Sequence, residues 1–148
     1  EKGLKDFTDL LEDFIEKSIP SSLEVLFIDE AHDLSLIQWE MVRHLWKHAK
    51  KTYIAGDDDQ AIFKWAGADV DHFIALKEEV NDIKVLDQSY RIPGGPIHEL
   101  SQKIINKVQN RFQKEYKPRD EIGLLKRYSD ITQVDMSTGN WLVLSSAN

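Results

Sequence analysis

The first part of the chain contains two kinds of hydrophobic pattern. Near the start, hydrophobic residues recur three or four positions apart, at Leu4, Phe7, Leu11 and Phe14. This spacing predicts an amphipathic helix over residues 4–17. Residues 23–28 instead form a short run of mostly apolar side chains, which predicts a strand buried on both faces.

The same two patterns continue to the end of the chain. Ser35 and Gln38 have the spacing of a capping box, so a helix is predicted from residue 35 to about residue 49. The other predicted elements are a strand over 52–55, a helix over 70–79, a strand over 83–86, a helix over 97–112 and a strand over 141–144. The polar residues 117–137 are expected to form a linker.

Strands that alternate with helices are typical of an α/β fold with a parallel sheet. Ligands of such sheets bind beyond the carboxyl ends of the strands. Two polar clusters follow predicted strands: Asp29 and Glu30 come directly after the first strand, and residues 56–60, Gly-Asp-Asp-Asp-Gln, come after the second. These clusters are therefore the candidates for a ligand site.

Composition narrows the class of protein. A chain of 148 residues with 41% hydrophobic residues suits one domain with a hydrophobic core. It has no apolar run of about 18 residues, so no membrane contact is expected. It has no cysteine, which excludes disulfides and thiol catalysis and fits a reducing, cytoplasmic location. Because the chain begins without Met and without a signal sequence, we expect it to be a fragment of a longer protein.

Charge is distributed unevenly over a chain whose net charge is −7. Residues 1–32 carry nine acidic and three basic residues, whereas residues 98–128 carry eight basic and four acidic ones. The basic segment could face a polyanion such as nucleic acid, or it could be a solvated helix face.

The first polar cluster, Asp29-Glu30-Ala31-His32, has residues suited to nucleotide chemistry. One carboxylate at the end of a strand can hold Mg²⁺ beside phosphates, and its neighbour can orient and deprotonate a water molecule. The alternative is an acidic pair that only begins the next loop.

The second cluster, residues 56–68, contains three adjacent acidic residues followed by Gln60, Phe63 and Trp65. Adjacent carboxylates repel one another, which is unfavourable in a strand or a packed helix. A solvated acidic turn with the two aromatic residues in the core would account for the acids. It would not account for the order in which acids, amide and aromatic residues occur.

These clusters resemble motifs of the superfamily 1 DNA helicases of the UvrD, Rep and PcrA group. Residues 26–33 resemble motif II, the Walker B segment, and residues 56–68 resemble motif III, which is the most specific of the matches. Residues 86–91, Leu-Asp-Gln-Ser-Tyr-Arg, resemble motif IV. The resemblance extends over about residues 5–148 and implies a RecA-like fold in an ATP-dependent DNA helicase.

The resemblance implies roles in binding ATP and Mg²⁺. Asp29 would belong to the Mg²⁺ shell, and Glu30 would activate water. Gln60 would sense the γ-phosphate and couple it to DNA. Arg91 would bind the γ-phosphate, where a planar cation suits developing charge. Tyr90 would stack on the adenine.

The resemblance also implies a DNA contact. Phe63 and Trp65 would stack on bases of single-stranded DNA, a contact that tolerates any sequence because every base has a π-face. Three positions depart from the family pattern: Ser89 replaces Asn, His32 replaces Gln and Ala66 replaces Arg. The last change would remove one DNA contact.

The sequence contains no Gly-x-x-x-x-Gly-Lys-[Ser/Thr] segment, so it lacks the phosphate-binding P-loop. We therefore expect an α/β, partial RecA-like P-loop NTPase domain with a parallel sheet that lacks the P-loop strand. Residues 1–116 would be the C-terminal part of the first RecA-like domain. Residues 117–148 would be a linker and the first strand of the second. This chain alone should not turn over ATP.

Two other functions remain open from the sequence. The chain could be a non-catalytic module that binds nucleic acid or a protein partner on the same scaffold; the sequence identifies no protein partner. A metal-dependent nuclease could instead use Glu30 with the three aspartates 57–59. The nuclease hypothesis gives Gln60, Phe63 and Trp65 no role.

Overall fold

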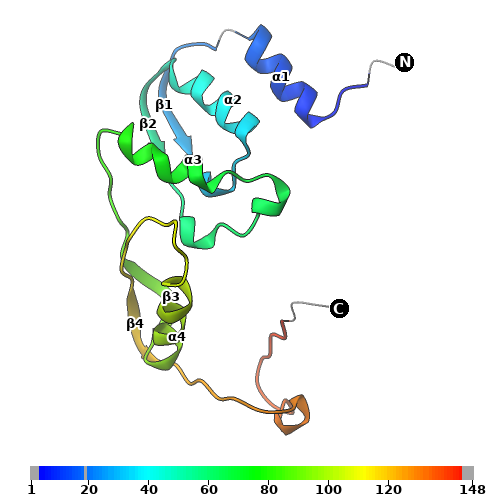
Figure 1. Cartoon of the computed structure of the whole chain (residues 1–148), viewed down its shortest axis with the longest axis vertical. Helices are drawn as coiled ribbons and strands as arrows, with labels where there is room; N and C mark the ends of the chain where they lie inside the picture. Colours follow the sequence, from blue (N-terminus) through cyan, green and yellow to red (C-terminus); the bar gives the residue numbers. More distant parts are fainter. Residues whose placement is uncertain (1–3, 19, 145–148) are drawn as a thin grey trace. The chain divides into compact units, whose positions relative to one another are not determined.

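The computed structural model describes residues 4–18 and 20–144 (Figure 1). The chain divides into two compact units. The first unit comprises Glu1–Asp87 and Ile104–Glu115, and the second comprises Gln88–Lys103 and Tyr116–Asn148. The division expected from the helicase resemblance, at residues 116 and 117, stays a prediction. No helix in the described part of the chain is long and apolar enough to cross a membrane.

Helix α1 (Phe7–Lys17) begins three residues later than the hydrophobic spacing predicted. Asp6 explains the difference, because it caps the helix. The Asp9 N–H donates to Asp6 Oδ1 and the Asp6 N–H donates to Asp9 Oδ2, both at 2.9 Å. Toward the other end, the Phe14 and His44 rings form a T-shaped pair with a centroid distance of 5.9 Å. This contact packs α1 against the next helix.

The sheet of the first unit consists of two parallel strands, β1 (Leu23–Ile28) and β2 (Ala49–Ile54), with Leu26 opposite Thr52. Helix α2 (Leu36–Trp46) connects them, and Ser35 and Gln38 form the predicted capping box. Strand β2 begins three residues before its predicted start. The polar residues there lack a strand pattern, but they pair with β1, which places Leu23 opposite Ala49.

The core of the first unit lies between this sheet and the helices. Its buried hydrophobic residues are Ala31, Trp39, Val42 and Leu76. Leu76 begins the short 3-10 helix η4 (Leu76–Glu78), which continues α3 (Val70–Ala75), so the predicted helix over 70–79 is confirmed in two pieces. Asp69 caps α3 by accepting the His72 N–H at 2.9 Å. The core thus fixes the loops that follow β1 and β2.

The second unit contains β3 (Gln88–Gly94), α4 (Pro96–Ile105) and β4 (Lys117–Ile122). The two strands are parallel and pair with an irregular register around Pro93. Gly123 follows β4 at a close approach of the chain: a Cβ there would lie 2.6 Å from Ile97 Cδ1 and 2.7 Å from Pro93 Cγ. Only glycine fits this position without a shift of those side chains.

Three predictions in the C-terminal half are wrong. Residues 83–86 form no strand, because no other strand of the described residues pairs with them and Leu86 is exposed. The next strand begins at Gln88 instead. Residues 117–122 are not a linker but strand β4, since backbone pairing with β3 orders a polar sequence. Residues 141–144 form no strand. The expected start of a further domain also includes residues 145–148, which lie outside the described residues.

Helix α4 also ends at Ile105, so the predicted helix over 97–112 is seven residues too long. The residues that follow form turns and bends, and among them Arg111 and Lys114 bind the loop after β2. The α/β class with parallel strands is confirmed, as two two-stranded sheets in the described residues.

Candidate functional site

Asp29 and Glu30 follow β1 directly, as predicted. The Ala55 N–H donates to Ile28 O at 2.8 Å, and the Ala31 N–H donates to Ala55 O at 2.9 Å. These bonds continue the pairing of β1 with β2 past the ends of the strands. They hold the two carboxylates at the carboxyl edge of the sheet, where both are exposed.

The backbone of Glu30 is left-handed, with φ 49° and ψ 39°. Among the described residues it is the one non-glycine residue with positive φ. That conformation is unfavourable for a residue with a Cβ, and residues held in it cluster at functional sites. Here it turns the chain sharply from β1 into the 3-10 helix η1 (Ala31–Asp33).

His32 connects this loop to the loop after β2. Its side chain is buried, and its Nδ1 accepts the Asp57 N–H at 3.0 Å. Because Nδ1 accepts, the proton of the neutral ring is on Nε2, which lies 3.5 Å from Asp33 Oδ1. Gly56 permits the close approach of the loop after β2 to His32. A Cβ at residue 56 would lie 2.8 Å from Phe73 Cζ and 3.2 Å from the backbone nitrogen of His32. His32, which stands where the family has Gln, thus joins the segment that resembles motif II to the segment that resembles motif III.

The acidic turn, Asp57 and the 3-10 helix η2 (Asp58–Gln60), follows Gly56. Asp57 Oδ1 accepts the Asp59 N–H at 3.2 Å, and Asp57 Oδ2 accepts the Gln60 side-chain N–H at 2.6 Å. The exposed Gln60 side chain is therefore held by the first residue of the turn.

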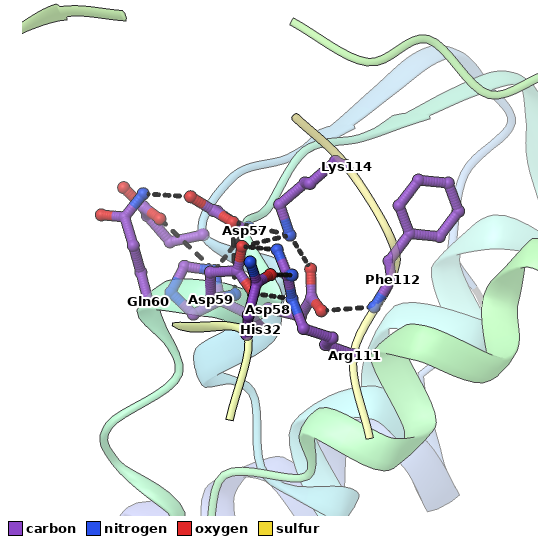
Figure 2. Close-up of polar contacts among 10 residues, drawn as sticks. His32, Asp57, Asp58, Asp59, Gln60, Arg111, Phe112 and Lys114 are labelled. Atoms are coloured by element: carbon purple, nitrogen blue, oxygen red, sulfur yellow. Dashed lines mark hydrogen bonds and ion pairs between the residues drawn. The ribbon is translucent and has the colours of Figure 1, made fainter. Parts of the chain in front are cut away.

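Three residues that follow α4 bind the acidic turn, and we name Arg111, Phe112 and Lys114 the basic clamp (Figure 2). Arg111 donates to both oxygens of Asp59, at 2.8 and 2.6 Å, and to Asn106 Oδ1 at 3.0 Å. The Phe112 N–H donates to Asp58 Oδ2 at 2.6 Å. Lys114 Nζ donates to Asp58 and lies 3.1 Å from Asp57 and 3.2 Å from Asp59.

The basic clamp neutralises most of the charge of the turn. The Asp58 and Asp59 side chains are 4% and 7% exposed, so these two carboxylates are not solvated. Buried carboxylates are stable only with charged partners and hydrogen bonds. The described residues contain no group of three or more His, Asp or Glu side chains that could hold a metal ion. The pairing of Asp58 and Asp59 with cations therefore disfavours the nuclease hypothesis.

Lys114 is held in its charged form. Burial lowers the pKa of Lys114, but its hydrogen bonds to Asp58 and Asp57 outweigh burial, so the pKa lies above the usual 10.5. A cation with a raised pKa in the folded state contributes stability that is complete below pH 10.5 and is lost as the pH rises through the folded-state pKa.

We therefore expect a Lys114→Met variant to be less stable than the wild type by an amount that is constant near neutral pH and shrinks above pH 10.5. Urea midpoints of the two proteins at several pH values measure this difference. A difference that already shrank near neutral pH would contradict the assignment of the effect to Lys114.

The two predicted DNA-binding aromatic residues lie just beyond the acidic turn. Phe63 precedes and Trp65 lies within the 3-10 helix η3 (Lys64–Ala66). Their ring centroids are 6.3 Å apart, and Trp65 is 83% exposed while Phe63 is 43% exposed. Placement of Trp65 in the core, one of the alternatives from the sequence, is therefore wrong.

Tyr90 and Arg91 lie on β3 in the second unit. Tyr90 is exposed and lines an open pocket with Gln88, Arg119 and Asp120. Ser89, at the position where the family has Asn, accepts the Ile92 N–H at 3.0 Å through its Oγ. The roles predicted for Tyr90 and Arg91 stay predictions.

Sequence reasoning missed the basic clamp. The sequence indicates Arg111 and Lys114 only as members of the basic segment 98–128. Three adjacent acids need cationic partners if they are buried, but no sequence pattern indicates which of the 19 Lys and Arg residues supply them.

Comparison with known proteins gives the family. The model of the UvrD/REP helicase N-terminal domain matches residues 2–81. The ATP-dependent DNA helicase Rep of Escherichia coli (strain K12) is 32% identical over 82 residues, which are 54% of this chain and 12% of Rep. The ATP-dependent DNA helicase PcrA of Staphylococcus epidermidis is 31% identical over 97 residues, 58% of this chain and 13% of PcrA.

A third relative, the ATP-dependent DNA helicase srs2 of Schizosaccharomyces pombe, is 29% identical over 147 residues, which are 95% of this chain and 16% of srs2. The chain thus spans less than a fifth of the length of each of these relatives. The family match covers more than half of the chain, including both loops at the carboxyl edge of the first sheet. The chain therefore belongs to the UvrD/REP helicase N-terminal domain family, and its resemblance to the UvrD, Rep and PcrA group is confirmed.

Proposed function

We propose that this chain is part of an ATP-dependent DNA helicase that translocates on single-stranded DNA. In this proposal the first unit is a partial RecA-like domain, and Asp29, Glu30 and Gln60 act at the nucleotide. The observation that carries the proposal is the continuity of one segment: Gln60, held by the acidic turn, lies three and five residues before Phe63 and the exposed Trp65.

The donor chemistry of the β1 loop fits Mg²⁺ and ATP. Carboxylate oxygens are the ligands that Mg²⁺ prefers, usually one or two of them with water and phosphate oxygens. Asp29 and Glu30 are exposed carboxylates at the edge where parallel sheets bind ligands. Asp29 would hold the Mg²⁺, which when bound supplies charge stabilisation to the phosphates.

The other proposed roles belong to side chains of this protein. Glu30 accepts a proton from the attacking water and orients it, because its carboxylate stands next to Asp29 on a backbone fixed by the pairing of β1 with β2. The hydrogen bond from Asp57 to His32 ties the loop of Glu30 to that of Gln60. In the second unit, Tyr90 would stack on the adenine and Arg91 would bind the γ-phosphate.

The proposal is tested by ATP hydrolysis of the full-length protein with and without single-stranded DNA. We expect DNA to stimulate hydrolysis, since Gln60 and the aromatic pair belong to one segment. Hydrolysis that ignores single-stranded DNA would contradict the proposal.

A non-catalytic binding module is the second candidate. It is favoured by the exposure of Trp65 beside Phe63, because an exposed aromatic pair can stack on bases without any nucleotide chemistry. DNA binding without ATP hydrolysis by the full-length protein would support this function.

The role of Trp65 gives a further prediction. We expect Trp65→Ala in the full-length protein to weaken single-stranded DNA binding by about 5- to 150-fold, because stacking of a base on an aromatic ring contributes about 1–3 kcal/mol. Fluorescence anisotropy of a labelled oligonucleotide measures the change.

Two control variants separate stacking from general loss of apolar surface. Trp65→Phe keeps an aromatic face and should retain most of the affinity. Ile62→Ala removes a neighbouring side chain that is 70% exposed but has no π-face, so it should bind like the wild type. Equal losses for Trp65→Ala and Ile62→Ala would contradict base stacking by Trp65.

A further inference from the structure

Lys114 lies at the centre of the acidic turn, although it comes from a segment more than fifty residues later in the sequence. Its Nζ contacts all three aspartates of residues 57–59, and its side chain is 8% exposed. A buried ammonium is stable only while carboxylates surround it. The position of Lys114 and the positions of the three carboxylates therefore depend on one another.

Asp57 transmits this position to Gln60. One carboxylate oxygen of Asp57, Oδ1, lies 3.1 Å from Lys114 Nζ, and the other, Oδ2, accepts the Gln60 side-chain N–H at 2.6 Å. The backbone N–H of Asp57 donates to His32. A continuous series of polar contacts thus joins Lys114 to the Gln60 amide (Figure 2).

Arg111 holds the other end of the turn. Its guanidinium donates to both oxygens of Asp59, and both side chains are buried. Bidentate pairs of this kind fix orientation as well as distance. Because Asp59 directly precedes Gln60 in the chain, the pair fixes the backbone from which Gln60 extends.

We propose that Lys114 is a positioning residue for Gln60, acting through the Asp57 carboxylate, while Arg111 anchors the backbone of the turn through Asp59. The inference rests on the proposed function, in which Gln60 contacts the phosphate of ATP. The Gln60 side chain has three rotatable bonds, and its hydrogen bond to a fixed carboxylate restricts it before the nucleotide binds. Because the Gln60 side chain is already oriented, less conformational entropy is lost when it reaches the reacting geometry.

The inference gives two residues of the basic segment 98–128 a role in contacts within their own chain. Arg111 and Lys114 are occupied with carboxylates of their own chain, rather than with the phosphates of a polyanion. The same segment offers a matched control, because Lys107 is exposed and lies only seven positions before Lys114.

The test is steady-state ATP hydrolysis by the full-length protein at saturating single-stranded DNA. We expect Lys114→Met to lower kcat by about 10-fold or more while KM for ATP changes less than about twofold, because the variant loses orientation of a group rather than a contact with substrate. Lys107→Met should match the wild type. Asp57→Asn, which interrupts the same series of contacts and leaves Lys114 paired with Asp58 and Asp59, provides a second variant should Lys114→Met not fold.

A double-variant cycle separates positioning from a general structural role. If Lys114 acts through Gln60, adding Lys114→Met or Asp57→Asn to Gln60→Ala should change kcat by less than about twofold, whereas independent effects would multiply. Suppose that the wild type hydrolyses ATP with stimulation by DNA. If the effects of the two substitutions then multiply, or if Asp57→Asn has the kcat of the wild type, the positioning role of Lys114 is overturned. A wild type without DNA-stimulated hydrolysis would overturn the proposed function and, with it, this inference.

Discussion

Replacement of Glu30 by Gln is expected to reduce DNA-stimulated ATP hydrolysis by the full-length protein by about 100-fold or more. Gln has the shape of Glu but cannot accept a proton, and proton transfer by a positioned side chain contributes about 10²- to 10⁴-fold. The left-handed backbone of Glu30 is unaffected by the change, so the loop should keep its path. Initial rates with and without single-stranded DNA measure the effect.

A matched control exists on the preceding strand. Glu24 is an exposed carboxylate on β1 whose partner is Lys50 at 2.6 Å, so Glu24→Gln removes an equal charge away from the carboxyl edge of the sheet. It should retain the wild-type rate. Equal rates for the wild type and Glu30→Gln would refute the role of Glu30 in ATP hydrolysis.

The second large effect is on stability. Trp39→Ala is expected to lower the free energy of unfolding by about 3–5 kcal/mol, because deletion of a buried aromatic side chain leaves a cavity as well as losing its transfer free energy. Trp39 is 1% exposed and packs with its ring centroid 4.8 Å from that of His72. Urea unfolding of the chain, followed by circular dichroism, measures the loss.

Two comparisons test the cause of this loss. Trp65→Ala removes an equally large side chain that is 83% exposed, so it should leave the unfolding free energy almost unchanged. Trp39→Phe should cost less than Trp39→Ala, since it keeps much of the volume and removes the buried Nε1, which has no hydrogen-bond partner among the described residues. Similar losses at Trp39 and Trp65 would contradict the burial argument.

The elements that could be predicted from the sequence are those with local signals. The strand β1 and the capping box of α2 have signals within a few residues, and both are confirmed. The predicted burial of β1 on both faces is wrong, because the sheet of the first unit has only two strands in the described residues and Val25 and Phe27 are 42% and 73% exposed. Strand β4 has no such signal, because its polar residues become a strand only through pairing with β3, about thirty residues away. Residues 83–86 show the converse, since a local apolar pattern without a partner forms no strand.

The same distinction holds for the candidate site. Motif order along the chain indicated Glu30 and Gln60, whose roles stay predictions. The partners that fix the acidic turn lie 52 to 56 residues further on, at Arg111 and Lys114, and no local pattern connects them to it. The burial of Asp58 and Asp59 requires cations beside them, and only the fold shows that burial and identifies the cations.

The basic clamp also has a consequence for synthesis. The first unit is discontinuous: its residues before Asp87 are made on the ribosome well before Ile104–Glu115, and the whole of β3 and most of α4 are made in between. Until Lys114 leaves the exit tunnel, Asp58 and Asp59 lack the cations that compensate their burial. The nascent first unit must therefore keep its acidic turn hydrated and open, and it closes only after part of the second unit has already emerged.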